Sequence, residues 1–273
     1  MKFEVLVPLV EEDMSTINDY SYTSFYVDLM YNDQKITNAT CFFSKRRGEV
    51  YLITNWHVVS GKNADTGECL DKWARIPDKL RVYMPKLQEN EEVCYSSENY
   101  MDVQLYDEAG NKLWFEKRVG DRWIDVAVIS CKNIDDYFYL PIEEAEEIFN
   151  ENTKCFIALE IYIIGFPFGN NYGYMPIWKK ASVASEPEVD IEGVPYFFAD
   201  TATKDGMSGS PVILYEKRFN PVVDKERRLT LHKTKFIGIY SGRIGANAFT
   251  RNDAQLGRVW KERVIQEILD ENE

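Results

Sequence analysis

The sequence predicts an all-β protein, and three observations support this. Aromatic residues make up 14% of the chain, and tyrosine, phenylalanine and tryptophan favour strands. Short apolar stretches alternate with turn residues about every ten residues, which is typical of a barrel or a sandwich. The 273 residues, 45% of them hydrophobic, are enough for one large domain or two half-domains with sizeable cores.

The first half of the chain is expected to be a meander of strands. Residues 1–20 are weakly patterned and are predicted to form a leader that packs on the body. Turn residues separate three predicted strands, which cover residues 22–31, 35–44 and 50–54. The third strand runs into an Asn-Trp-His-Val-Val segment, so we expect His57 at the end of a strand.

The remainder of this half contains fewer clear strands. A hairpin is predicted over residues 99–115, with its turn at residues 107–111. Asp125 then leads into an apolar strand over residues 126–129. The acidic connection to the second half is predicted to hold one short helix over residues 141–149, with its charges on a solvated face.

The second half is expected to add another set of strands and one helix. Its strand-like segments lie at residues 161–167, 181–184, 196–200, 212–215 and 236–240. Apolar residues between positions 256 and 269 recur with a period of about 3.6, which predicts an amphipathic C-terminal helix. No long linker and no internal repeat divides the chain, so residues 1–273 are predicted to form a single domain.

Composition limits the classes of partner. The net charge of −13 disfavours nucleic acid and anionic membranes, because their phosphates would be repelled. Five widely spaced cysteines without a C-x-x-C pair indicate neither a zinc site nor a full disulfide framework, and no metal or other cofactor is predicted. The N-terminal stretch is too short and too acidic for a signal peptide, and no run of about 18 apolar residues is present. We therefore expect a protein of the cytoplasm.

The most informative stretch is Gly-Met-Ser-Gly-Ser-Pro at residues 206–211, which an apolar strand follows. Gly206 has no Cβ, so the backbone can take a positive φ and approach a reacting carbonyl closely. Successive N–H groups in such a turn can point into one small space and hold a developing oxyanion. Ser208 is therefore a candidate nucleophile, although the same residues also suit an ordinary loop. Ser210 is a weaker candidate, because it lacks the glycine that precedes Ser208 by two positions.

A serine hydroxyl is a weak nucleophile near pH 7, so it needs a base, and the base needs an orienting group. Only two histidines are present, His57 and His232, and His232 lies in a charged stretch expected on the surface. Asp125 is notable because a carboxylate that enters a buried strand needs partners. Asp102 also precedes a strand-like stretch and is a weaker candidate. Taken singly, His57 also fits an ordinary core histidine, and Asp125 fits a strand cap.

The order His57, Asp125, Ser208 is that of one known triad scaffold. In these residues the sequence resembles the trypsin/chymotrypsin-like serine peptidases. The resemblance spans about residues 22–260 and rests on Thr-Asn-Trp-His-Val at 54–58, Asp-Val-Ala-Val at 125–128, the serine stretch at 206–211 and, more weakly, Phe-Ile-Gly-Ile-Tyr-Ser-Gly at 236–242. It implies two six-stranded antiparallel β-barrels, over about residues 20–135 and 154–255, with a C-terminal helix over 256–270.

The resemblance also implies a role for each residue of the site. His57 would act first as general base and then as general acid, Asp125 would orient its ring and stabilise the imidazolium, and Ser208 would attack the carbonyl. The N–H groups of Gly206 and Ser208 would form the oxyanion hole, worth roughly 3–4 kcal/mol per donor.

Two features depart from the secreted members of that family: the residue before Ser208, and the absence of the cysteines that flank the histidine in those enzymes. Met207 stands where zymogen-activated members carry an aspartate that pairs with a newly cut N-terminus, so that switch is not expected here. By analogy, the residues that contact substrate would be Ala202, Thr203, Ser241 and Gly242. No carboxylate lies among them, which disfavours a preference for lysine or arginine, and Arg243 either faces an acidic side chain or is solvated.

Three functional hypotheses follow. The first is a serine endopeptidase that cleaves protein or peptide substrates through an acyl-enzyme and is regulated by a protein partner or by oligomerisation. The second is a catalytically silent trypsin-like fold that binds or regulates proteins, although a silent site has no chemical need for all three residues. The third is an esterase-like α/β hydrolase, whose G-x-S-x-G elbow is not matched here because Ser210 occupies the place of the last glycine.

Overall fold

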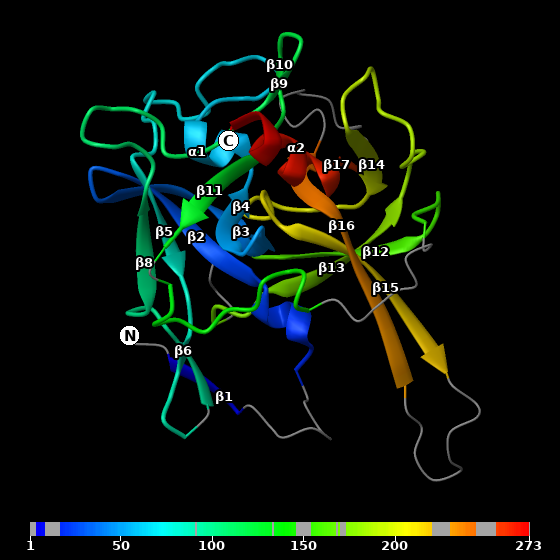
Figure 1. Ribbon diagram of the computed structural model, residues 1–273, viewed down its shortest axis with the longest axis horizontal. Helices are drawn as coiled ribbons and strands as arrows, with labels where there is room; N and C mark the ends of the chain where they lie inside the picture. The colour runs from blue at the N-terminus through cyan, green and yellow to red at the C-terminus, as the bar shows by residue number, and fades with distance from the viewer. Residues whose placement is uncertain are drawn as a thin grey trace.

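The fold consists of two β units that lie side by side, with a C-terminal helix where they meet (Figure 1). It is seen in a computed structural model that describes residues 4–8, 17–90, 92–132, 134–145, 154–167, 169, 173–219, 230–243 and 255–272. We call the two units the N-terminal sheet and the C-terminal barrel. The all-β prediction and its two-unit architecture are confirmed.

The N-terminal sheet is a six-stranded antiparallel sheet. Its strands, in spatial order, are β11 (Ala127–Cys131), β4 (Glu49–Thr54), β3 (Gln34–Arg46), β2 (Ser24–Tyr31), β5 (Lys79–Tyr83) and β8 (Tyr100–Gln104). Within the described part of the chain β11 and β8 do not pair with each other, so this unit is an open, six-stranded half-barrel. The predicted strands over residues 22–31, 35–44, 50–54 and 126–129 are confirmed within a few residues.

The C-terminal barrel is closed by six antiparallel strands. In order around the barrel, these are β12 (Glu160–Gly165), β13 (Ile177–Val183), β14 (Tyr196–Asp200), β17 (Leu256–Lys261), β16 (Thr230–Arg243) and β15 (Pro211–Phe219). Pro211 is the first residue of its strand, a position where the missing N–H is tolerated.

Smaller elements surround the two units. A three-stranded sheet has the order β1 (Glu4–Pro8), β7 (Glu92–Ser96), β6 (Lys86–Leu87), and a two-stranded ribbon joins β9 (Arg118–Val119) to β10 (Arg122–Trp123). The helical elements are η1 (Asp19–Tyr22), α1 (Trp56–Ser60) and α2 (Arg263–Asn272). None of the helices in the described ranges is long and apolar enough to cross a membrane.

The prediction of a helix from residue 256 is wrong in its first half. Residues 256–261 form β17, because this segment pairs with β14 on one side and β16 on the other and thereby closes the barrel. The helix begins at Arg263, and its apolar face is buried through Val264, Ile265, Ile268 and Leu269. Barrel closure has therefore overridden the helical period of the sequence.

Three further predictions are corrected. His57 does not end a strand but lies in α1, which begins after Asn55 and ends at Gly61 in the left-handed conformation (φ 67°). The hairpin over residues 99–115 has its predicted turn, in which Asp107 N donates to Asn111 O at 2.9 Å, but β8 pairs with β5 rather than with a return strand. Of the predicted helix at 141–149, residues 142–145 form turns and 146–149 lie outside the described residues.

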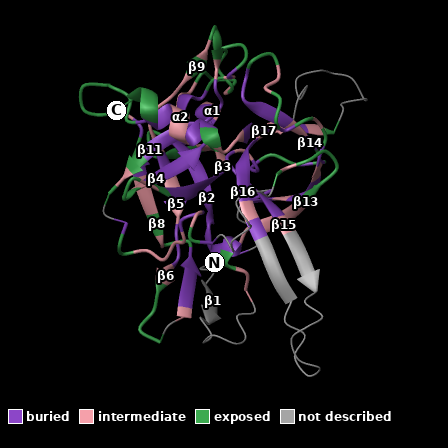
Figure 2. Cartoon of the chain, turned by 45° about the vertical axis from the view of Figure 1, so that its right-hand side comes forward, coloured by how far each residue is buried: buried purple, intermediate pink, exposed green. Residues whose placement is uncertain are grey.

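One hydrophobic core joins the two units. It includes Phe42 of β3 and Phe236 of β16, whose ring centroids are 5.3 Å apart, together with the buried face of α2. Figure 2 shows that the buried residues follow the strands where the units meet, whereas the exposed residues gather in the outer loops. Residues far apart in the sequence are thus held rigidly at this junction.

Thr40 of β3 makes three of the hydrogen bonds that cross the same junction. Its hydroxyl donates to Gly206 O at 2.8 Å and accepts from Phe166 N at 3.3 Å, and its own N–H donates to Ser208 O at 2.8 Å. Thr40 is fully buried, so water cannot replace these partners.

We expect Thr40→Val to lower the free energy of unfolding by about 1–3 kcal/mol, because it keeps the branched shape but leaves Gly206 O and Phe166 N without their hydroxyl partner. Urea unfolding followed by tryptophan fluorescence measures this loss. Thr37→Val, at an exposed position of the same strand, is the control and should change stability little. Equal effects of the two substitutions would contradict the assigned role of Thr40.

Candidate active site

His57 and Asp125 form a tight pair at the edge of the N-terminal sheet. The Oδ2 atom of Asp125 lies 2.8 Å from His57 Nδ1, and its Oδ1 atom accepts the backbone N–H of His57 at 2.8 Å. Asn55 Nδ2 donates to Asp125 O at 2.7 Å, which fixes the start of α1 against the same segment. The Asp125 carboxylate is buried but satisfied, and it orients the imidazole so that Nε2 remains for other contacts.

Ser208 lies in a tight turn, residues 205–210, which we call the serine turn. Gly206 and Gly209 take φ values of +96° and +84°, a region that favours glycine. A Cβ on Gly206 would lie 2.3 Å from Phe166 O, so a larger residue does not fit without a shift. In the described structure the N–H groups of Gly206 and Ser208 donate to no protein acceptor, which leaves two donors for an incoming oxygen.

Backbone contacts bring the serine turn to the end of β4, three residues before His57. Ser208 O accepts from Thr40 N, and Gly209 packs so closely that an added Cβ would lie 2.1 Å from Thr40 O and 2.5 Å from Thr54 Oγ1. Thr54 in turn donates to Thr40 O at 2.8 Å. Among the described side chains, Ser208 Oγ and the His57 ring do not form a hydrogen bond, and such bonds are often long without substrate.

Ser210 and Asp102, two weaker candidates for the site, lie in different environments from Ser208 and Asp125. Ser210 is fully buried, whereas Ser208 is partly exposed. Asp102 lies on β8, where Arg81 contacts both its oxygens at 2.8 and 2.9 Å. The hydrogen bonds from Arg81 hold the pKa of Asp102 below its ordinary value, so this carboxylate is a structural ion pair. The side chain of His232 is outside the described residues, as is that of Arg243; their backbones lie in β16.

The predicted substrate-contacting residues are only partly brought together. Gly242 lies beside Ser208, the candidate nucleophile, since a Cβ on Gly242 would lie 3.8 Å from Ser208 Oγ. Thr203 is buried and hydrogen-bonded to the Tyr240 hydroxyl, whereas Ala202 is exposed. Ser241 Oγ accepts the indole N–H of Trp260 at 3.1 Å, which directs it toward β17.

Sequence reasoning missed Glu116, which anchors the tryptophan next to His57. Its Oε2 atom accepts the indole N–H groups of Trp56 and Trp114 at 2.7 and 2.8 Å. Trp56, the residue before His57, stacks on Trp123 with ring centroids 4.9 Å apart. The indole N–H of a buried tryptophan requires a hydrogen-bond acceptor. Trp56, next to the candidate base, was therefore the one signal in the sequence that indicated a residue such as Glu116.

Three of the cysteines are poor alternatives to Ser208 as the candidate nucleophile. All five cysteines are free. Burial raises the pKa values of Cys131 and Cys155 to about 11 and that of Cys41 above its usual range. A thiol that stays protonated at neutral pH is a weak nucleophile, so these three cysteines do not offer an alternative chemistry.

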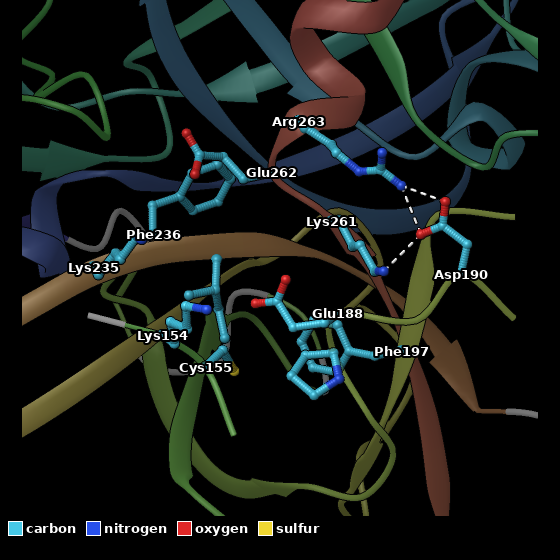
Figure 3. Close-up of a pocket in the computed structure, with 12 residues that line it drawn as sticks. Lys154, Cys155, Glu188, Asp190, Phe197, Lys235, Phe236, Lys261, Glu262 and Arg263 are labelled. Atoms are coloured by element: carbon cyan, nitrogen blue, oxygen red, sulfur yellow. Dashed lines mark hydrogen bonds and ion pairs between the residues drawn. The ribbon is translucent and has the colours of Figure 1, made fainter. Parts of the chain in front are cut away.

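A pocket of about 490 Å³ lies away from this site, between β14, β16 and the start of α2 (Figure 3). Its lining is strongly charged, and Asp190 pairs with both Lys261 and Arg263 at 2.6 Å. None of the predicted site residues lines it. We therefore place the candidate active site at the junction of the two β units and not in this pocket.

A half-barrel and a closed six-stranded barrel, with a histidine–aspartate pair at their junction, define the chymotrypsin-like fold. Residues 39–219 match the trypsin-like peptidase domain family. The chain belongs to this family.

Comparison with solved structures agrees with this fold. The serine endoprotease from Yersinia pestis has a TM-score of 0.50 at 12% identity, covering 95% of this chain and 67% of that chain. A weaker likeness, which adds no argument of its own, is to the Rv3671c protease from M. tuberculosis in its active form. Its TM-score is 0.46 at 15% identity, covering 97% of this chain and 88% of that chain. No curated protein sequence matches this chain.

Substitution of the two candidate aspartates, Asp125 and Asp102, should have different effects on labelling and on stability. Asp125→Asn should reduce the rate of fluorophosphonate labelling by about 10³-fold or more, because the amide cannot hold the imidazole in the required tautomer and charge state. Asp102→Asn should cost about 1 kcal/mol of stability through its ion pair with Arg81 and leave labelling unchanged. Rates from gel fluorescence on matched protein samples distinguish the two. Loss of labelling in Asp102→Asn alone would reverse the assignment.

Proposed function

We propose that this protein is a serine endopeptidase that uses Ser208, His57 and Asp125 as a catalytic triad. The observation that carries the proposal is the bidentate contact of Asp125 with both the ring and the backbone of His57, at the place where the serine turn reaches the N-terminal sheet. Membership of the trypsin-like peptidase family supports the same chemistry. The substrates are proteins or peptides, and no cofactor takes part.

The reaction divides into two transfers of an acyl group. His57 Nε2 takes the proton of the Ser208 hydroxyl as its oxygen attacks the scissile carbonyl, and the imidazolium is stabilised by Asp125. The N–H groups of Gly206 and Ser208 bind the oxyanion. His57 then protonates the leaving amine, which departs with the C-terminal fragment. Water attacks the acyl-enzyme with His57 again as base, and the acid product and free Ser208 are released.

Steric constraints at the serine turn support the proposed oxyanion-binding role of its N–H groups. Gly206 and Gly209 both take positive φ and both lie against backbone oxygens of neighbouring segments. The backbone conformation that leaves two N–H groups free is therefore fixed by packing. Such preorganised donors stabilise a developing oxyanion more than flexible donors do, because they need no reorientation during the reaction.

Ser208→Ala should abolish covalent labelling by a fluorophosphonate, because it removes the attacking oxygen. Ser210→Ala is the matched control, since it removes a buried hydroxyl that has no hydrogen-bond partner in the described structure. That variant should label at the wild-type rate. Intact-mass measurement of the adduct, followed by peptide mapping, locates the modified serine. An unlabelled wild-type protein would favour the silent binding module instead.

We also infer that a protein partner or self-association controls the activity. Met207 replaces the acidic residue that pairs with a new N-terminus in secreted members, and it is buried in the barrel core. A new N-terminus made by proteolytic cleavage would therefore find no carboxylate at this position to pair with. The five free cysteines fit the reducing cytoplasm as the compartment we propose.

Regulation by a partner or by assembly predicts that the purified monomer cleaves casein slowly. Its specific activity should rise with protein concentration or on addition of extract from its source cells, because a second chain must complete the active state. Casein hydrolysis at several protein concentrations, with light scattering for the oligomeric state, measures this. Full, concentration-independent activity of the monomer would contradict the inference.

A further inference from the structure

The space beside the candidate nucleophile is bounded by two segments of the C-terminal barrel. One is the chain that leads through Thr203 to the serine turn, and the other is the end of β16 at Gly242. During acylation, the substrate carbonyl carbon is bonded to Ser208 Oγ. The side chain of the residue that supplies this carbonyl then starts only three bonds from that oxygen, so these two segments are its nearest walls.

Tyr240 is anchored directly beside Ser208. Its carbonyl accepts the N–H of Gly209 at 2.9 Å, and its own N–H donates to Ser210 O at 2.9 Å. This backbone pairing involves the two residues that directly follow the nucleophile. Tyr240 therefore cannot move away from the site without breaking β16 from the serine turn.

The Tyr240 side chain contacts the Thr203 segment and packs against β17, the strand paired with β16. Its hydroxyl is hydrogen-bonded to Thr203 Oγ1. On the other side the ring packs on Gly257 of β17, where an added Cβ would lie 2.3 Å from Cε2 and 2.8 Å from the hydroxyl. Gly257 is the register partner of Arg243, so the ring lies behind the Gly242 segment that runs past Ser208.

The ring leaves little room for a substrate side chain. Tyr240 is fully buried and belongs to the same packed cluster as Met207 of the serine turn. Displacing it would break a buried hydrogen bond to Thr203, itself buried, and leave both hydroxyls without that partner. Binding of a large substrate side chain would therefore be opposed by the free energy of breaking this hydrogen bond and by the loss of packing around the ring.

We propose that Tyr240 closes the primary specificity pocket and restricts cleavage to bonds that follow a small residue, such as glycine, alanine or serine. This inference rests on the proposed function, since it assumes that Ser208 is acylated. It assigns Tyr240 as the specificity-determining residue, with Thr203 as the residue that positions it.

The test compares peptidyl diphenyl phosphonates that present alanine, phenylalanine or lysine to the site, on the full-length protein. We expect the alanine probe to label Ser208 about 100-fold faster than the phenylalanine probe, a discrimination within the range that pocket shape can supply. In Tyr240→Ala, the phenylalanine probe should gain at least about tenfold relative to alanine. Tyr162→Ala, a tyrosine of the same barrel outside the site, is the matched control and should keep the wild-type ratio.

The outcomes separate this inference from the proposed function. Failure of every probe, including a simple fluorophosphonate, at high protein concentration and with extract from the source cells added would remove the proposed peptidase activity itself. Labelling by the phenylalanine or lysine probe as fast as by alanine would overturn the pocket assignment and leave the peptidase in place. An unchanged ratio in folded Tyr240→Ala, checked by circular dichroism, would also overturn it. If that variant does not fold, the wild-type series still decides.

Discussion

The candidate site depends on one buried threonine, because Thr40 joins the serine turn to the N-terminal sheet by hydrogen bonds. Its N–H and hydroxyl both bind carbonyl oxygens of the serine turn, at Ser208 and Gly206, while its carbonyl accepts from Thr54 on the next strand. The helix that bears His57 begins two residues after Thr54. The serine turn and His57 are therefore both held by the same short stretch of backbone, although they are far apart in the sequence.

Much of this arrangement could be predicted because each motif encodes a local physical requirement. The glycines of the serine turn are needed for positive φ and for close approach to Phe166 O and Thr40 O, so these residue types indicate a constrained turn from the sequence alone. Asp125 was recognisable because a carboxylate entering an apolar strand must find partners. The order of the three residues then selected one scaffold among several.

The remaining features could not be predicted because they depend on long-range pairing. Residues 256–261 have a helical apolar period, but β14 and β16 require a sixth strand between them, and pairing takes precedence. Glu116 lies in no recognised motif, and the motif at residues 236–242 gives no role for the Tyr240 side chain. Their roles appear only when Trp56 and Trp114 converge on one carboxylate and when Thr203 and Gly257 enclose one ring.

The stacked indoles of Trp56 and Trp123 have a spectroscopic consequence. Two stacked chromophores whose ring planes are 14° from parallel couple their electronic transitions, and one of them is covalently adjacent to His57. Any movement of α1, which carries His57, against β10 would change this exciton coupling. The protein thus contains an intrinsic optical reporter of the position of the His57 helix, readable by circular dichroism without an added dye.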